Sequence, residues 1–217
     1  MRPQRGLSLI ELLLGCAVGL LIAGGATRLF VEHLRDSRRL LLEARLHQDL
    51  RAAAALVARD LRRAGFWQQA LAATVPPRRP NPYRDITPSV GPGTDVTTYS
   101  FSRDTTENDL VDLSEATGFR LSQGTLQTLN GGSWQALTDP AVLRVTRFVV
   151  SPRRLTIPLG HLCHPACDAT TTACPSLTVR SYRLELHGES ASDSQIQRQI
   201  HEAVRVRNDE VAAVDCP

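Results

Sequence analysis

One carboxylate stands out among the residues whose type and spacing could do chemistry. Glu11 is the only charged residue in an apolar stretch that runs from Leu7 to Thr27. As an α-helix with ~1.5 Å of rise per residue, this stretch spans roughly 30 Å, which is the thickness of the hydrocarbon core of a bilayer. A carboxylate at that depth costs on the order of 3 kcal/mol, so we expect Glu11 to face a specific partner.

The residues around Glu11 have the pattern of a processed leader. A short basic leader, residues 1–6, ends at Gly6. The sequence RGLSLIEL at residues 5–12 resembles the class III signal of type IV prepilins and pseudopilins, although Leu7 stands where that family usually has Phe. The resemblance implies that prepilin peptidase cleaves between Gly6 and Leu7 and methylates the new N-terminus on Leu7. Glu11 then becomes the fifth residue of the mature chain.

This processing gives Glu11 a partner of opposite charge. The new amine on Leu7 is a cation near the membrane end of the same helix. A neighbouring subunit that is displaced along the assembly axis can bring its own Leu7 amine to Glu11, which removes two isolated charges from lipid and fixes the register of assembly. The alternative is a pair between Leu7 and Glu11 of one helix, four residues apart, and the two pairs can form in different states.

This N-terminal segment has two alternative interpretations besides a prepilin signal. A secretory signal peptide has a shorter apolar core followed by a small-x-small cleavage site. Residues 23–26 are small enough, but cleavage there leaves an amphipathic helix without an anchor. An ordinary signal anchor does not require Glu11 and usually has more flanking positive charge, so the prepilin interpretation is favoured.

Composition limits the classes of partner. The 217 residues allow one membrane helix and one globular domain. The net charge of +3 falls by the two arginines of the leader, to +1 in the mature chain, and aromatic residues make up 5%. Near-neutral charge and few aromatic side chains disfavour nucleic acid as a partner, although Arg78, Arg79 and Arg84 could touch phosphates. We therefore expect no nucleic-acid partner.

The cysteines divide into two groups. Cys16 lies within the apolar helix, where it is expected to pack as a small apolar residue. The candidate disulfide cysteines are Cys163, Cys167, Cys174 and Cys216. The prepilin topology places them in the periplasm, where disulfides persist, and the sequence allows three pairings. A zinc site with His161 and His164 is the alternative, but the spacing is not that of a standard zinc motif.

A second, amphipathic half of the helix follows the apolar half. Apolar residues recur every three or four positions on one face, namely Leu42, Leu46, Leu50, Ala53, Val57, Leu61 and Ala64. Gly65 follows in the position of a helix C-cap. The pattern predicts one long helix over residues 7–64, whose second half packs on a sheet.

The rest of the chain predicts an antiparallel sheet. An irregular loop is expected at the Pro/Gly-rich residues 74–94. Strands are expected at residues 96–101, 142–150, 176–187 and 196–207, with a hairpin formed by 119–121 and 125–129. In the last strand, Ile196, Ile200, Val204 and Val206 are expected on one face, with Arg198, Glu202 and Arg205 mostly on the other.

These elements predict a pilin-like α+β fold, in which a long N-terminal helix packs on an antiparallel β-sheet domain. The expected segments are a leader at 1–6, a transmembrane half-helix at 7–27, an amphipathic half-helix at 28–65, a loop at 66–94 and a periplasmic β-sheet domain with a Cys-rich C-terminal region at 95–217.

No catalytic residue is recognised in the sequence. The histidines lie in no Ser/His/Asp or metal motif, and no Gly-rich loop has the pattern of a phosphate site. The acidic run Asp104, Glu107, Asn108, Asp109 and Asp112 offers oxygen ligands for calcium, but it lacks the EF-hand spacing, and a solvated loop is favoured. We expect no enzyme activity, no metal and no cofactor.

Two further motifs narrow the resemblance. RDLRRAGF at residues 59–66 resembles the end of the helix in PilW-type minor pilins and recurs in the J-type minor pseudopilins of type II secretion. AVRVRN at residues 203–208 resembles the terminal strand of the same group. Arg59 and Arg63 have a simpler interpretation as cations that interact favourably with the helix dipole.

The resemblance implies a minor type IV pilin that takes part in priming, assembly or tip formation of the pilus. Its implied partners are prepilin peptidase, other minor and major pilins and the bacterial inner membrane, in a hetero-oligomer. The chain would cross that membrane once, with its C-terminal domain in the periplasm, and then enter the fibre or its tip. The alternatives are a J-type minor pseudopilin and, from another class, a signal-anchored periplasmic enzyme or binding module.

Overall fold

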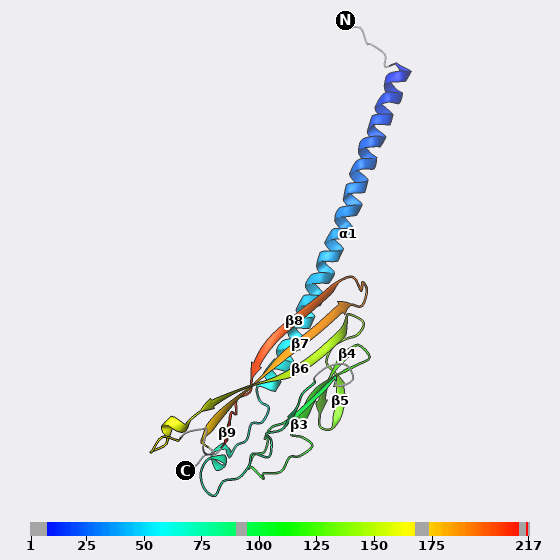
Figure 1. Cartoon of the computed structure of the whole chain (residues 1–217). Helices are drawn as coiled ribbons and strands as arrows, with labels where there is room; N and C mark the ends of the chain where they lie inside the picture. The colour runs from blue at the N-terminus through cyan, green and yellow to red at the C-terminus, as the bar shows by residue number, and fades with distance from the viewer. Residues whose placement is uncertain (1–7, 90–94, 168–173, 213–215, 217) are drawn as a thin grey trace. The chain divides into compact units, whose positions relative to one another are not determined.

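The structure is a computed structural model that describes residues 8–89, 95–167, 174–212 and 216. It divides into two compact units, an N-terminal unit of residues 1–44 and a C-terminal unit of residues 45–217. The helix and strands are labelled in Figure 1. In chain order they are α1 (Leu9–Leu61), β1 (Ile86–Thr87), β2 (Val96–Ser100), β3 (Ala116–Ser122), β4 (Thr125–Asn130), β5 (Ser133–Ala136), β6 (Leu143–Pro158), β7 (Ser176–Ser190), β8 (Gln197–Arg205) and β9 (Glu210–Ala212).

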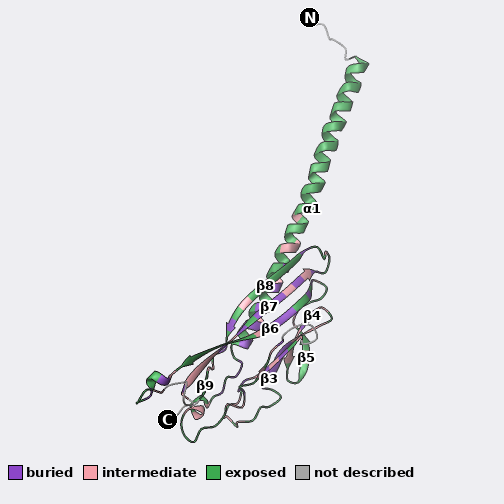
Figure 2. Ribbon diagram, viewed as in Figure 1, coloured by how far each residue is buried: buried purple, intermediate pink, exposed green. Residues whose placement is uncertain are grey.

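The described part of the N-terminal unit consists of the first part of α1. The helix begins where the carbonyl of Ser8 accepts the amides of Glu11 and Leu12, at 3.0 and 3.1 Å. Its most apolar window has a mean hydropathy of 2.2, and none of that window is buried, as Figure 2 shows. The helix is therefore long and apolar enough to cross a membrane, and its apolar surface finds no cover in its own unit.

The remainder of α1 forms part of the core of the C-terminal unit. The buried residues of the helix recur at the predicted spacing, and they are Leu46, Leu50, Ala53, Ala54, Val57, Ala58 and Leu61. This confirms the expected amphipathic second half. The helix ends at Leu61 in the structure, three residues before the predicted end, because the following residues form a turn.

Gly65 ends this turn and connects it to β2 and to two loop asparagines. Its φ of +74° lies in the left-handed region, which glycine adopts without the steric cost of a Cβ atom. Its amide donates to the carbonyl of Ser100 on β2 at 2.9 Å. Its carbonyl accepts the side-chain amides of Asn81 and Asn208, at 2.9 and 2.7 Å. Gly65 therefore ends the turn after α1, and its predicted position as the C-cap of the helix is wrong.

The first sheet contains β1 to β5 in sequence order, and all neighbouring strands are antiparallel. The hairpin of β3 and β4 turns through Gln123 and Gly124, both with positive φ, as a two-residue hairpin turn requires. Buried and more exposed residues alternate along β2 as expected. The predicted irregular loop is wrong at β1, since Ile86 and Thr87 pair with Tyr99 and Thr98 of β2.

The second sheet has the order β6, β7, β8, with β9 paired to β7, so the single expected sheet is replaced by two. Residues with even numbers on β7 face the core from Arg180 to Ser190. Gly188 lies under α1, because a Cβ atom at this position would stand 3.2 Å from Cδ1 of Leu50. Backbone hydrogen bonds connect the sheets from the amide of Val145 to the carbonyl of Gly124 and from the amide of Val150 to the carbonyl of Ser89. The hydroxyl of Ser89 also donates to the carbonyl of Phe148, at 3.2 Å.

The expected division of faces on the last strand is wrong for Arg198 and Glu202. Side chains of a strand alternate, so even-numbered residues share a face. Glu202 pairs with Leu184 of β7, whose side chain is fully buried, and lies beside Val204 on the core side. Its carboxylate lies 3.4 Å from Arg62, which directly follows α1, near the edge of the sheet.

The second half of β6 extends beyond β8 as a ribbon. Residues 152–158 of β6 are exposed and pair with the beginning of β7, which β9 joins on the other side (Figure 1). Pro152 and Pro158 have no amide to offer a further strand, and Arg153 and Arg154 place charge along the ribbon. These residues disfavour the addition of another strand at the free edge of β6.

Candidate functional site

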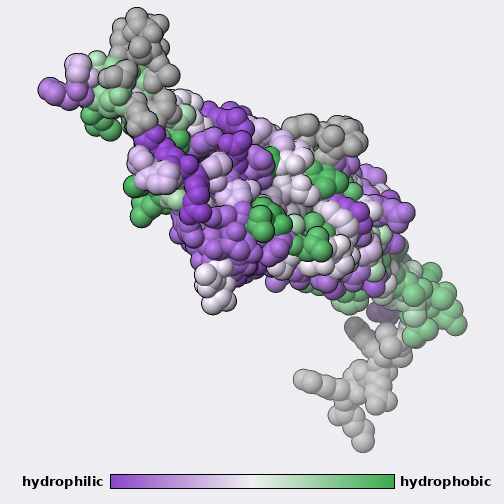
Figure 3. Space-filling view, turned by 90° about the horizontal axis from the view of Figure 1, so that it is seen from below, coloured by the Kyte–Doolittle hydropathy of each residue, from purple (hydrophilic) through white to green (hydrophobic). Residues whose placement is uncertain are grey.

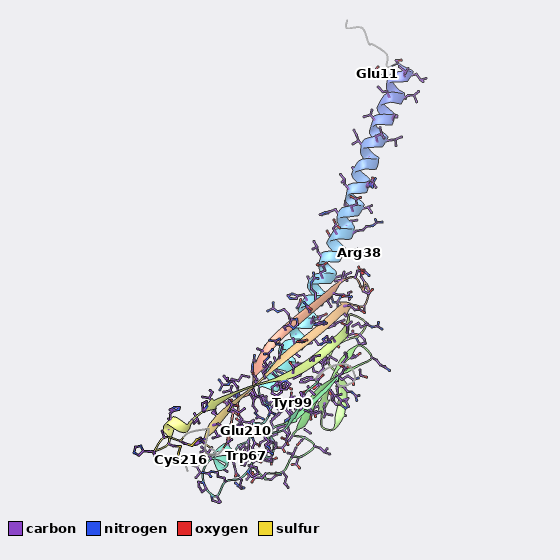
Figure 4. The ribbon with its side chains drawn as sticks, viewed as in Figure 1. Glu11, Arg38, Trp67, Tyr99, Glu210 and Cys216 are labelled. Atoms are coloured by element: carbon purple, nitrogen blue, oxygen red, sulfur yellow. A yellow bond between two sulfur atoms is a disulfide. The ribbon has the colours of Figure 1, made fainter. Side chains whose placement is uncertain are left out.

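Glu11 lies on an exposed helix surface, and it is labelled in Figure 4. Among the residues that the structure describes, it has no ion-pair partner. Its surroundings are large exposed apolar side chains, such as Leu12 and Leu14, at 59% and 69% exposure. The predicted cleavage and methylation positions, Gly6 and Leu7, lie outside the described residues.

Exposed apolar side chains continue beyond the predicted membrane half. They include Leu29, Phe30, Leu34, Leu40 and Leu41, which are between 48% and 71% exposed. The charged residues of the same region pair along the helix, with Arg28 and Glu32, and Arg39 and Glu43, each 3.4 Å apart. Such exposed pairs stabilise the helix little, but they leave the apolar side chains free for contact with other helices.

The four C-terminal cysteines form two disulfides. Cys163 pairs with Cys216, and Cys167 pairs with Cys174, with Cα atoms 5.5 and 5.8 Å apart. This confirms the predicted oxidised state and selects one of the three pairings. The zinc alternative is excluded for these cysteines, because each sulfur is bonded to another sulfur. The first disulfide fastens the chain just after β9 to the end of the ribbon.

A buried carboxylate organises the acidic segment that follows β2. Glu115 is fully buried and accepts the amides of Arg103 and Asp112, at 2.8 and 3.0 Å. The hydroxyl of Tyr83 lies 3.1 Å from Glu115 Oε1, 3.0 Å from Glu107 Oε1 and 3.1 Å from the carbonyl of Leu110, so three acceptors surround its one proton. The segment is a loop, as expected, in which Asn108 and Asp112 are exposed while Asp104, Glu107 and Asp109 lie half-buried around Glu115.

Trp67 joins the same network from the end of the helical turn. It is 1% exposed, and its indole N–H donates to Asp109 Oδ1 at 2.9 Å. The amide of Asp109 donates in turn to Glu107 Oε1 at 3.0 Å. Oxygen atoms of Asp104, Asp112 and Glu115 lie within 4.8 Å of one another, as a cation site requires. The lone pairs of Glu115 are already used by amides and Tyr83, which favours a structural role for this cluster.

The electrostatics of the cluster follow from burial and these hydrogen bonds. Burial raises the pKa of Tyr83 well above its usual value, and Glu107 and Glu115 add to the effect. Burial also pushes the pKa of Glu107 upward, but hydrogen bonds from the Asp109 amide and the Tyr83 hydroxyl outweigh it and lower that pKa. Burial and the neighbouring Glu115 raise the pKa of Asp104. The network therefore holds Tyr83 neutral and Glu107 ionised at neutral pH.

A polar cavity of about 760 Å³ lies on the other side of Trp67. Five arginines line it, namely Arg78, Arg79, Arg84, Arg180 and Arg207. The first three form a basic group that the sequence indicates, whereas Arg180 and Arg207 come from β7 and from the segment after β8. Figure 3 shows hydrophilic side chains gathered over the visible face of the C-terminal unit, with apolar side chains in separate patches.

Comparison with known families agrees with the N-terminal motif and the fold. Residues 1–27 match the prokaryotic N-terminal methylation motif, and residues 39–206 match the family of prepilin peptidase-dependent protein B. The chain is thus a prepilin-like protein with a pilin-like α+β fold. It belongs to the prepilin peptidase-dependent protein B family, and this membership implies processing by prepilin peptidase. The chain has no significant match among curated proteins or among solved structures.

Proposed function

We propose that this protein is a minor type IV pilin of the PilW type, which takes part in priming, assembly or tip formation of a pilus. Prepilin peptidase would cleave it between Gly6 and Leu7 and methylate Leu7. It would then move from the inner membrane into a fibre or its tip, in a hetero-oligomer with other minor and major pilins. Its C-terminal unit would lie in the periplasm before assembly, where both disulfides can form.

The observation that carries this proposal is one carboxylate on an uncovered apolar helix. The apolar window of α1 is unburied, and Glu11 is its sole charge. Lipid can cover the leucines but stabilises a carboxylate poorly. An assembly of parallel helices can cover both, since neighbouring leucines pack against one another and the Leu7 amine of an adjacent subunit meets Glu11. Exchange of lipid for neighbouring helices would thus set the register of the fibre.

The proposed role is assembly, without chemistry performed by this chain. The buried carboxylate of Glu115 is occupied by two backbone amides and by Tyr83. The indole of Trp67 is likewise bonded to Asp109. The polar groups of this cluster are therefore bonded to one another and hold the loop in place, which supports a structural function. A J-type minor pseudopilin of type II secretion shares these features and is the second candidate, favoured by the RDLRRAGF motif at residues 59–66.

Intact mass and N-terminal sequencing test the proposal. The protein would be isolated from cells with and without prepilin peptidase, and as the Gly6→Ala variant. Gly15→Ala is the matched control, because Gly15 lies in α1 with open space around its Cα atom. We expect a chain that begins at methylated Leu7 in the wild type and in Gly15→Ala. We expect an unprocessed chain in cells without the peptidase and in Gly6→Ala. Processing that persists without the peptidase or in Gly6→Ala would contradict the proposal.

The choice between pilus and secretion system needs a second measurement. Deletion of the gene would be followed by counting surface pili and by assaying secreted proteins. Loss of pili with normal secretion supports the pilus. The reverse result assigns the protein to type II secretion.

A further inference from the structure

The cavity beside Trp67 is built from three segments of the C-terminal unit. Its walls are the short 3-10 helix Ala70–Ala73 with the loop that follows it, the start of β7, and the segment from Arg207 to Val211. Trp67 and Glu210, which are labelled in Figure 4, both line it. The volume of about 760 Å³ is that of a site for a small molecule or a few side chains.

The charge on the cavity wall is unbalanced. Five arginines face two carboxylates, Asp209 and Glu210. Asp209 does not offset them fully, because its Oδ2 lies 2.6 Å from Arg205, which is outside the cavity wall. Arg79 is held by Asp109 and Gln69.

Arg180 is the deepest of these cations. It is 6% exposed, on the core face of β7 just beyond the end of α1. Its two terminal nitrogens donate to the backbone carbonyls of Arg84 and Asn208, at 2.6 and 3.1 Å, and its Nε has no hydrogen-bond partner. Carbonyl dipoles orient a guanidinium without neutralising it, so a net positive charge remains in a partly dehydrated place.

Two more arginines present their side chains at the cavity with little internal compensation. Arg84 meets Asp85 at 3.6 Å, in a pair whose side chains are 57% and 93% exposed. Arg207 forms no side-chain ion pair with any residue in the described ranges, and its amide donates to the carbonyl of Arg62. Arg84, Arg180 and Arg207 therefore supply donors that suit the planar geometry of a carboxylate.

We propose that this cavity is a receptor for the carboxylate side chains of an acidic segment on a neighbouring pilin-like subunit. The partner rests on the proposed function, in which this chain assembles with other subunits. The negative charges of Asp209 and Glu210 on the wall would repel a polyanion such as nucleic acid, which leaves no gap between its phosphates for them. Apolar wall residues such as Trp67 and Pro80 suit a peptide, whose backbone and side-chain stems can pack between the arginines.

Trp67 provides a direct readout of this site in the full-length protein in detergent. The chain has two tryptophans, so Trp134→Phe leaves Trp67 as the sole reporter. The probe is the peptide acetyl-Glu-Asp-Glu-amide, and acetyl-Gln-Asn-Gln-amide is its neutral counterpart. We expect a saturable change of Trp67 fluorescence with the acidic peptide, weakened by salt, and none with the neutral one.

Matched arginine variants separate this site from general attraction to positive charge. The double variant Arg84→Gln/Arg207→Gln is expected to weaken binding of the acidic peptide roughly tenfold. Arg153→Gln/Arg154→Gln removes the same charge from the exposed ribbon and is expected to leave binding unchanged. Arg180→Lys, which keeps the charge but loses the fork of donors, is expected to weaken binding with unaltered circular dichroism.

Three results would overturn the proposal. The first is equal binding of the acidic and the neutral peptide, and the second is an equal loss of binding affinity in the two double variants. The third is displacement of the peptide by inorganic phosphate at a concentration well below that of the peptide, which would indicate a phosphate site. Failure of the proposed function is distinguishable, because the cavity would still bind the peptide in a protein whose N-terminus is never processed.

Discussion

Glu115 shows how a single residue determines the fold of a long loop. Its carboxylate gathers two backbone amides and the hydroxyl of Tyr83 at a fully buried position. The amides of Arg103 and Asp112 are part-buried and would lose this acceptor, and an unpaired donor costs more than the net gain of an ordinary hydrogen bond. The segment between β2 and β3 therefore depends on one side chain more than on its exposed acidic residues.

Replacement of this carboxylate is expected to destabilise the C-terminal unit. Glu115→Gln keeps the shape of the side chain but turns an NH₂ group toward donors, so we expect the free energy of unfolding to fall by about 2 kcal/mol. Urea unfolding followed by circular dichroism measures this. Glu189→Gln is the control, because Glu189 meets only Arg144, at 3.9 Å, in a partly exposed pair. Equal stability of the two variants would contradict the role given to Glu115.

The residues of the candidate site were only partly predictable. The roles of Glu11 and of the cysteines depend on short local patterns, namely an isolated charge in an apolar run and a cysteine cluster. Glu115 and Arg180 act through partners that are distant in sequence, since Tyr83 lies 32 residues from Glu115 and Arg84 lies 96 from Arg180. No periodicity or spacing reports such a contact, so the sequence indicated an acidic loop but not the buried carboxylate that holds it.

Among the elements, α1 and the β3–β4 hairpin were predictable because their signals are local. Apolar spacing defined the buried face of the helix, and two turn residues defined the hairpin. The length of β6 was not predictable, because Pro152, Arg153 and Arg154 weaken a strand pattern, and the pairing with β7 holds them extended. Likewise Glu202 lies on the core face of β8 because Arg62 of another element reaches it.

The two disulfides act on elements of different size, and their contributions to stability should differ. Cys163–Cys216 closes a loop of 53 residues, and Cys167–Cys174 closes one of 7. Loop-closure entropy gives about 4 kcal/mol for the first and about 2 kcal/mol for the second. We expect the double alanine variant of the first pair to lose more stability in urea unfolding. A larger loss from the second pair would contradict this order.

At the scale of the whole molecule, all three tyrosines are held neutral by the fold. Burial is the main cause that raises the pKa of Tyr83, Tyr99 and Tyr182 above the ordinary value. A folded-state pKa that is raised contributes stability below the ordinary tyrosine pKa of about 10, and this contribution is lost as the pH rises above it. The folded protein should therefore resist tyrosine ionisation until it unfolds.

An alkaline titration tests this expectation. Absorbance at 295 nm, which reports tyrosinate, is expected to stay low past pH 10 and then rise steeply together with the loss of the circular dichroism signal. In concentrated urea the same tyrosines should titrate gradually around pH 10. Gradual ionisation near pH 10 in the folded protein, without unfolding, would show that the tyrosines are accessible.

The bond between Cys163 and Cys216 also determines how the molecule bears mechanical load. A pull on the C-terminus reaches Cys216 and passes through sulfur to Cys163, so β7, β8 and β9 lie within a covalent loop that carries no tension. With the disulfide intact, the 53 residues of this loop cannot lengthen the chain, which removes roughly 180 Å of extension. The central strand β7 of the second sheet and its partners β8 and β9 are thus shielded from a force that would otherwise separate them one after another.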